Sequence, residues 1–239
     1  MRAILGPVAA LGAVLALASC GSSPSDTTAN GANGSGRDFF PEQPSPKPLG
    51  RFSPRNDCIS LPGAKPFFLA FEKAVQKRDA DALLSLTDPN VKLDFGGSKG
   101  IGAFRERLAD KQGQLWDELD ALTILGCAHA KNGDMVMPWY AAQPMDDIDT
   151  ANAMIVVGAD VPLLQAPNAN APKVATETWD AVTLTDGYHP DAEYLKVKTP
   201  SGKEGYMEAD MLRSPLDYRL RVSPAAGNQW HIVSFVKGD

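Results

Sequence analysis

Apolar and polar positions divide the chain into three stretches. Residues 3–18 are almost continuously apolar, residues 21–57 show almost no apolar periodicity, and regular patterning begins at Cys58. The first stretch is too short for a membrane-spanning helix, and the single Arg2 before it is typical of a secretory signal peptide. The pattern therefore predicts a signal peptide over residues 1–19, then a linker and a folded body.

The first part of the folded body has the spacing of amphipathic helices. Apolar residues three and four positions apart predict helices over 65–78, 79–87, 101–108 and 115–122. Asp79 stands at the N-cap position of the second helix. Alternation over 91–95 predicts a strand, and the two glycines after it turn the chain into the next helix.

The rest of the body has the alternation of strands. Segments 123–130 and 135–140 flank Lys131-Asn132-Gly133-Asp134, whose Asn-Gly centre is a strong hairpin signal. Residues 217–237 alternate around a second turn and predict a C-terminal hairpin. An isolated hairpin is marginal in water, so it must pair with other strands. We expect it to complete the sheet of the first domain, while the sequence also allows it to extend the second.

Composition narrows the functions that fit. The chain has 239 residues, with 23 Lys and Arg against 29 Asp and Glu, and a formal net charge of −6. This length suits one large or two small domains. Nucleic-acid binding needs a basic face, because affinity comes largely from neutralising phosphates, and the sequence has no basic stretch. We therefore expect no nucleic-acid partner.

The end of the signal peptide carries a specific motif. Leu17-Ala18-Ser19-Cys20 has an aliphatic residue, two small residues and a cysteine, and it resembles the lipobox of bacterial lipoproteins. The resemblance implies that Cys20 carries diacylglycerol and palmitate and anchors the chain in the lipid bilayer. Gly21 is not the aspartate that commonly retains lipoproteins in the inner membrane. The expected location is the cell envelope, on the periplasmic face of the outer membrane where the organism has one.

Residues 20–57 are expected to tether the body to the membrane. Gly, Ser and Pro make up nearly half of this segment, and apolar residues are few. Such a composition cannot bury enough surface to offset the entropy of ordering the chain. Pro44-Ser45-Pro46-Lys47-Pro48 is expected to extend locally as polyproline II. The whole coil spans on the order of 30 Å.

The order of elements after Cys58 resembles a known fold. Two helices, a strand, a glycine turn, a helix and further strands over residues 64–142 are similar to the nuclear-transport-factor-2-like cone fold. The resemblance implies an α+β domain over residues 58–150. That family includes enzymes, ligand-binding pockets and scaffolds, so the fold alone implies no chemistry.

Residues 153–215 resemble a bacterial SH3-like domain. The segments that carry the resemblance are 156–167, 171–176 and 193–207, the last with a glycine turn between two strands. The resemblance implies a small all-β barrel of five or six strands. Leu164 or Gln165 stands where the family usually has an arginine, and Tyr194 and Tyr206 replace tryptophans. The expected fold class is therefore α+β, with a cone-like helix-and-sheet domain followed by an SH3-like barrel.

Two cysteines remain once Cys20 is lipidated. In an oxidising compartment Cys58 and Cys127 are expected to form a disulfide. Closing a loop of about 70 residues stabilises a fold by roughly 4 kcal/mol in the chain-entropy model. The alternative is a pair of buried thiols.

No residue pattern requires an enzyme or a cofactor. Gly96-Gly97-Ser98-Lys99-Gly100 fits the nucleophile-elbow pattern, but the hairpins downstream do not suit that class of hydrolase, and a glycine turn with Ser98 as a helix N-cap is favoured. His129, His189 and His231 lack metal-ligand spacing. Asp146-Asp147-Ile148-Asp149 lacks the rest of a calcium loop. We expect no catalytic residue, no metal site and no cofactor.

Aromatic side chains are the remaining binding candidates. Trp179, Tyr188, Tyr194 and Tyr206 lie in the SH3-like segment, where such residues line grooves for peptides or glycans. The resemblance implies recognition of wall peptides, because bacterial SH3-like domains often accompany wall hydrolases. The leading hypothesis is a non-enzymatic lipoprotein that binds peptidoglycan, through its peptide or glycan, or an envelope protein.

A second hypothesis places a small-molecule binder or an enzyme in the first domain. Asp94, His129, Trp139 and Tyr140 are its candidate pocket residues. Convergence of these side chains in a roomy cavity supports it, whereas a cone filled by Phe and Leu counts against it. A third hypothesis is a structural role through self-association.

Overall fold

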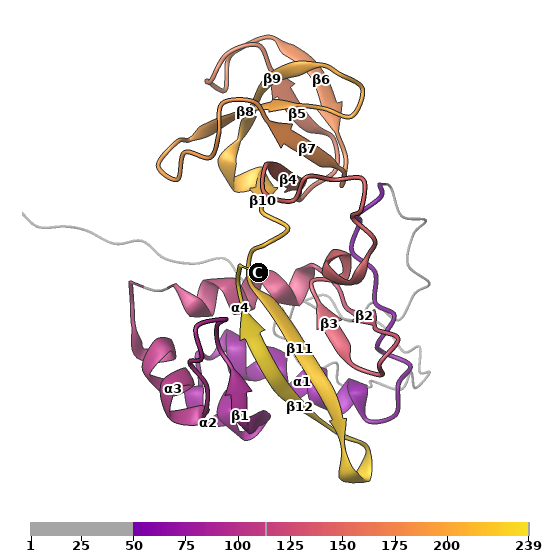
Figure 1. Ribbon diagram of the computed structural model, residues 1–239, viewed down its shortest axis with the longest axis vertical. Helices are drawn as coiled ribbons and strands as arrows, with labels where there is room; N and C mark the ends of the chain where they lie inside the picture. Colours follow the sequence, from indigo (N-terminus) through magenta and orange to yellow (C-terminus); the bar gives the residue numbers. More distant parts are fainter. Residues whose placement is uncertain (1–49, 113, 239) are drawn as a thin grey trace, which may run out of the picture. The chain divides into compact units, whose positions relative to one another are not determined.

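Two β-sheets and four α-helices make up the part of the chain that the computed structural model describes, residues 50–112 and 114–238 (Figure 1). The signal peptide, Cys20 and residues 20–49 of the expected tether lie outside these residues. Helices occur together with mostly antiparallel strands. The α+β fold class is therefore confirmed.

The helices occupy the four segments that have helical spacing. They are α1 (Ala64–Gln76), α2 (Ala80–Ser85), α3 (Ile101–Ala109) and α4 (Leu115–Ile124). The Ala82 N–H donates to Oδ1 of Asp79 at 3.0 Å, so the predicted N-cap of α2 is confirmed. The apolar face of α1 is buried through Phe67, Phe68 and Phe71.

A five-stranded sheet packs against these helices, and together they form what we call the α+β region. The strand order is β1 (Thr87–Lys92), β12 (Gln229–Val236), β11 (Arg219–Ala225), β3 (Met135–Met137) and β2 (Ala128–His129). β1 and β12 run parallel, and the other neighbours are antiparallel. The C-terminal hairpin β11–β12 therefore lies at the centre of the sheet (Figure 1).

One apolar core joins this sheet to the helices. Leu220 and Val222 of β11 and Ile232 and Phe235 of β12 are buried in the same cluster as the helical Phe and Leu side chains. Trp230 belongs to this cluster, and its indole N–H donates to the Pro62 carbonyl at 2.9 Å. Apolar burial of this kind contributes about 25 cal/mol per Å² removed from water. The core therefore depends on strands that come last in the described chain.

A second sheet makes up the β region, which we define as residues 153–213. Its order is β10 (Leu212–Arg213), β4 (Ala153–Val156), β7 (Ala181–Leu184), β8 (Tyr194–Lys198), β9 (Glu204–Glu208), β5 (Val161–Leu164) and β6 (Lys173–Glu177). Alternate residues such as Val156, Leu163, Val197 and Met207 fill a core of its own. The order has seven strands and is open, since β10 and β6 do not pair among the described residues. No closed barrel is present among the described residues, so the small five- or six-stranded SH3-like barrel stays a prediction.

The folded body begins earlier than the sequence predicts. Residues 50–57 fall at the end of the expected tether, yet Phe52 has no exposed surface and its N–H donates to the Trp179 carbonyl at 2.7 Å. Gly126 allows the segment to approach closely, because a Cβ there would lie 2.2 Å from the Arg55 carbonyl oxygen. A lone aromatic among Gly and Pro has no periodicity, so the pattern gave no sign of this packing.

Two local predictions are wrong. The segment 123–130 is a strand only near its end, because α4 continues to Ile124 and β2 comprises Ala128–His129. Ser98 is not the N-cap of α3, whose cap position is occupied by Gly100. The Ser98 N–H instead donates to Oδ1 of Asp94 at 2.9 Å. The acidic side chain four residues earlier therefore organises this turn.

Candidate functional site

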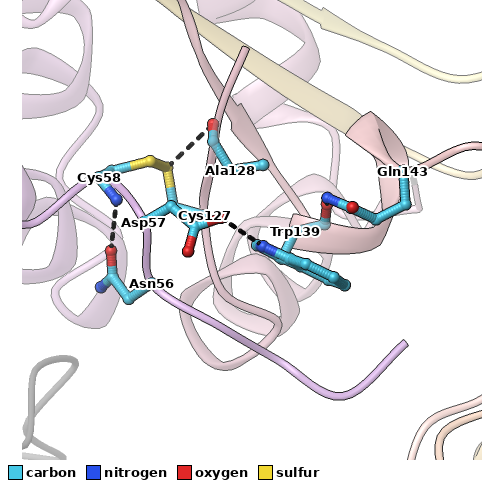
Figure 2. The surroundings of a disulfide bond; sticks show 7 residues. All are labelled: Asn56, Asp57, Cys58, Cys127, Ala128, Trp139 and Gln143. Carbon is cyan, nitrogen blue, oxygen red and sulfur yellow. Dashed lines mark hydrogen bonds between the residues drawn. A yellow bond between two sulfur atoms is a disulfide. The ribbon is translucent and has the colours of Figure 1, made fainter. Parts of the chain in front are cut away.

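Cys58 and Cys127 form a disulfide, as the sequence predicts (Figure 2). Their Cα atoms are 5.8 Å apart, and the two residues are 69 positions apart in sequence. The Cys58 N–H donates to Oδ1 of Asn56 at 3.2 Å, and the indole N–H of Trp139 donates to Oδ2 of Asp57 at 2.7 Å. These contacts fasten the segment before α1 to the edge of the five-stranded sheet.

The four aromatic residues expected to contact a ligand lie at three separate places. Tyr194 and Tyr206 share the outer face of β8 and β9, because Tyr206 pairs with Lys196, two residues after Tyr194. Trp179 packs in the apolar cluster that includes the start of the folded body. Tyr188 lies on the loop between β7 and β8 with 61% of its surface exposed. The structure therefore does not gather them into one groove.

Tyr188 borders a hollow of about 590 Å³. Its lining includes the apolar residues Met154, Leu184 and Leu212 and the charged residues Arg213, Asp217 and Lys237. Two carboxylates hold Arg213 in place, since its guanidinium lies 2.9 Å from Glu118 and 3.5 Å from Asp217. A hollow with an apolar wall and a few fixed charges is typical of sites that bind small or extended ligands.

The candidate pocket residues of the first domain do not converge. Asp94 is bound by the Arg107 guanidinium and the Ser98 N–H, and these hydrogen bonds hold the pKa of its carboxyl below the usual range. Trp139 and Tyr140 are buried in a different cluster, where burial raises the pKa of the Tyr140 hydroxyl. The side of the sheet that faces the helices is filled by Phe and Leu side chains. This filling counts against a ligand cone between sheet and helices.

A larger hollow lies on the opposite face of the five-stranded sheet. Its volume is about 1060 Å³. Its lining includes Lys92, Lys131, Arg219, Arg221, Val136 and Ser234. His129 borders this hollow, whereas Asp94, Trp139 and Tyr140 do not line it. No local sequence pattern predicts this site, because its residues lie on the polar positions of strands far apart in the chain.

The other chemistry-bearing residues have structural partners. Nε2 of His189 lies 2.7 Å from the Asp186 carbonyl oxygen. Both carboxylate oxygens of Asp147 accept hydrogen bonds from Arg51, each at 2.7 Å. Asp149 accepts a hydrogen bond from the Asn152 side chain at 2.7 Å. Within residues 50–112 and 114–238, no group of His, Cys, Asp and Glu is arranged to hold a metal ion.

No family model matches the chain, and neither a curated protein nor a solved structure matches it. Among the described helices, none is both long and apolar enough to cross a bilayer. The function is therefore argued from the residues and their geometry.

Proposed function

We propose that this chain is a non-enzymatic lipoprotein of the cell envelope, anchored through acylated Cys20, whose SH3-like β region binds cell-wall peptide or glycan, or an envelope protein. The lipobox-like motif ending at Cys20 and the Gly/Ser/Pro-rich segment after it support the anchor and tether. The disulfide supports an oxidising compartment, because such bonds persist outside the cytosol.

The observation that carries the binding site is the exposed ring of Tyr188 beside its hollow. The hollow has an apolar wall from Met154 and Leu184, and a rim with the cations Arg213 and Lys237 and the anion Asp217. Wall peptides combine small apolar side chains with free carboxylate and amino groups. Arg213 and Asp217 pair with each other, so Lys237 is the rim cation that can pair with a peptide carboxylate, while the tyrosine ring covers an apolar side chain.

The test is a pull-down of the full chain, in nonionic detergent, with purified wall sacculi. We expect wild-type protein to sediment with the sacculi, and Tyr188→Ala to reduce the bound fraction several-fold without changing thermal stability. Tyr194→Ala is the matched control, because it removes a tyrosine from the outer face of β8 in the same region.

Each outcome of this pull-down bears on the proposal. Loss of binding in Tyr188→Ala alone supports the hollow beside the β7–β8 loop. Loss in Tyr194→Ala or Tyr206→Ala with an intact fold moves the site to the outer face of β8 and β9. Absence of any binding to sacculi contradicts the wall ligand and leaves an envelope protein as the partner.

A second candidate function is small-ligand binding by the α+β region. The observation that favours it is the hollow of about 1060 Å³ on the face of the five-stranded sheet away from the helices. This volume is just above the range that small-molecule sites have, roughly 300–1,000 Å³.

A further inference from the structure

The hollow on the five-stranded sheet is crossed by one continuous row of residues. Lys92 on β1 pairs with Ser234 on β12, Ser234 with Arg221 on β11, and Arg221 with Val136 on β3, which pairs with Ala128 on β2. Residues directly opposite each other in neighbouring strands point to the same face of a sheet. The row therefore places two long cationic side chains on the open face, with one strand between them.

The charge of this hollow is opposite to that of the chain. Its charged lining residues are Lys92, Lys131, Arg219, Arg221 and Asp57, so four cations face one carboxylate in a chain whose net charge is −6. Arg221 has a carboxylate partner in Asp134 at 3.4 Å. Within the described residues, no carboxylate pairs with Lys92, Lys131 or Arg219. The guanidinium of Arg219 donates to the Pro215 and Gly238 carbonyls, and Arg221 contacts Asp134 through Nε. Lys92, Lys131 and the remaining N–H groups of Arg221 are therefore the cationic donors available to an anionic ligand.

The floor of the hollow has both polar and apolar residues: Ser234 lies between Lys92 and Arg221 in the row, and Val233 and Val236 lie near it on β12. Val136 also lines the hollow, and the ring of Phe95, half of whose surface is exposed, borders it below the Lys92 ammonium at 4.0 Å. Neighbouring strands are about 4.8 Å apart, so the backbones at Lys92 and Arg221 are separated by roughly 10 Å. A matching ligand has an apolar middle and an anionic group near each end.

A second copy of the chain does not suit this surface. A two-fold interface sets the same patch against itself, which here brings like charges together. Like-charge contacts across an interface are unfavourable by several kcal/mol.

We propose that this hollow binds an elongated organic anion with an apolar middle and two carboxylate or phosphate groups, Lys92 and Arg221 pairing with the anionic groups and Lys131 with a longer ligand at the far edge. The inference rests on the second candidate function, small-ligand binding by the α+β region. It adds the chemical class of the ligand.

The test is isothermal titration calorimetry on the full chain in nonionic detergent at an ionic strength of about 0.1 M, where the Debye length is about 10 Å. The probes share one chain length: octanedioate, octane-1,8-diyl bisphosphate, octanoate and octane-1,8-diol. We expect both dianions to bind, octanoate to bind more weakly by up to about fivefold, and the diol to give no measurable heat, because each partly exposed ion pair adds up to about fivefold in affinity. The two dianions distinguish a carboxylate ligand from a phosphate ligand.

Two double variants locate the effect. Lys92→Gln with Lys131→Gln removes two cations of the hollow, and we expect it to weaken binding of the preferred dianion by up to about fivefold, because Lys92 is the one of the two that pairs with a probe of this length. Lys73→Gln with Lys77→Gln is the matched control, because it makes the same change in net charge at exposed positions in and just after α1. We expect this control to change the affinity by less than about twofold, since surface charges more than a Debye length away are screened.

The possible results separate the inference from the function on which it rests. Equal binding of diol and dianion overturns the anionic ligand and leaves the small-ligand function standing. No binding of either dianion overturns the inference. Equal weakening by both double variants shows an effect of net charge and overturns the location. If the chain forms a dimer whose association becomes stronger when Lys92 and Lys131 are replaced, this face binds a second copy of the chain. That result likewise overturns the inference.

Discussion

The carboxylate of Asp94 organises the turn between β1 and α3. The sequence predicts this turn from its glycines alone. Oδ1 of Asp94 accepts the Ser98 N–H at 2.9 Å, and the other carboxylate oxygen is bound by the Arg107 guanidinium. Both bonds favour the charged carboxylate, so the pKa of Asp94 is lowered, first by the Ser98 hydrogen bond and then by Arg107. The strand-to-helix turn therefore depends on an ionised side chain.

This lowered pKa predicts a pH-dependent contribution to stability. A carboxylate with a lower pKa in the folded state stabilises the fold at pH values above its unfolded pKa, about 3.9, and loses that contribution as pH falls through the folded pKa. We expect the difference in unfolding free energy between wild type and Asp94→Asn to be largest at pH 5–7 and to shrink below about pH 4. Urea denaturation at several pH values measures it, and a difference that grows in acid contradicts the assignment.

Individual residues were predictable where the signal is local. Asp79 precedes an apolar helical pattern, and an N-cap needs only its own side chain and a backbone N–H three residues on. Ser98 has a suitable side chain but fails, because α3 begins at Ile101 and Gly100 is the residue immediately before it. The residue type satisfies the local rule, and the position at which the glycine turn ends decides which residue caps the helix.

At the scale of elements, the disulfide joins the segment before α1 to the β2 edge of the sheet. Replacing Cys58 and Cys127 together by Ala is expected to lower the unfolding free energy by about 4 kcal/mol, because a loop of about 70 residues is then no longer closed in the unfolded chain. Chemical denaturation measures this loss. Adding a reductant must bring wild type close to the variant and leave the variant unchanged, and a loss below about 1 kcal/mol contradicts the prediction.

The strands could be predicted from alternation in the sequence, whereas the neighbours with which they pair could not. Alternation over 217–237 predicts two strands, which the structure has as β11 and β12. Their neighbours β1 and β3 are set by contacts such as Thr87 with Ile232, which no local pattern encodes. The same limit hid the basic hollow, because Lys92 and Arg221 are each an ordinary polar position on a strand and become neighbours only through that pairing.

At the scale of the whole molecule, Arg213 connects the β region to α4. Its side chain is 11% exposed and pairs with Glu118 at 2.9 Å and with Asp217 at 3.5 Å. Removing one partner of a buried charge pair is costly, because the remaining charges lose their compensation. The carboxylate of Glu118 on α4 therefore helps to hold β10, the last strand of the β region, in place.

Arg213→Ala is therefore expected to lower the unfolding free energy by about 3 kcal/mol and to separate the thermal transition into two. Arg78→Ala is the control, because Arg78 pairs at 2.7 Å with Asp117, the neighbour of Glu118 on α4, while both side chains are mostly exposed. That pair is worth less than about 1 kcal/mol. Calorimetry measures the loss of unfolding free energy in each variant. Equal losses in the two variants contradict the stabilising role of the buried Arg213 charge pair.

The lipid anchor is tested on the intact cell. Cys20→Ala removes the thiol that would carry the lipid, so we expect the protein to move from the membrane fraction to the soluble fraction of the envelope. Globomycin, which blocks cleavage of lipidated precursors, should cause a larger precursor to accumulate in wild type and not in the variant. Unchanged membrane fractionation of the variant would contradict lipid anchoring at this residue.

The central position of β11 and β12 has a consequence for the order in which the protein can be built. Synthesis delivers a chain from its N-terminus, so the four described helices and β1 emerge well before residues 219–236. Until then the apolar faces that will contact Leu220, Ile232 and Phe235 have no sheet centre to cover them. The α+β region therefore cannot close until the C-terminal hairpin has been made. A nascent chain stalled before Arg219 is expected to expose the apolar faces of its helices and to bind chaperones.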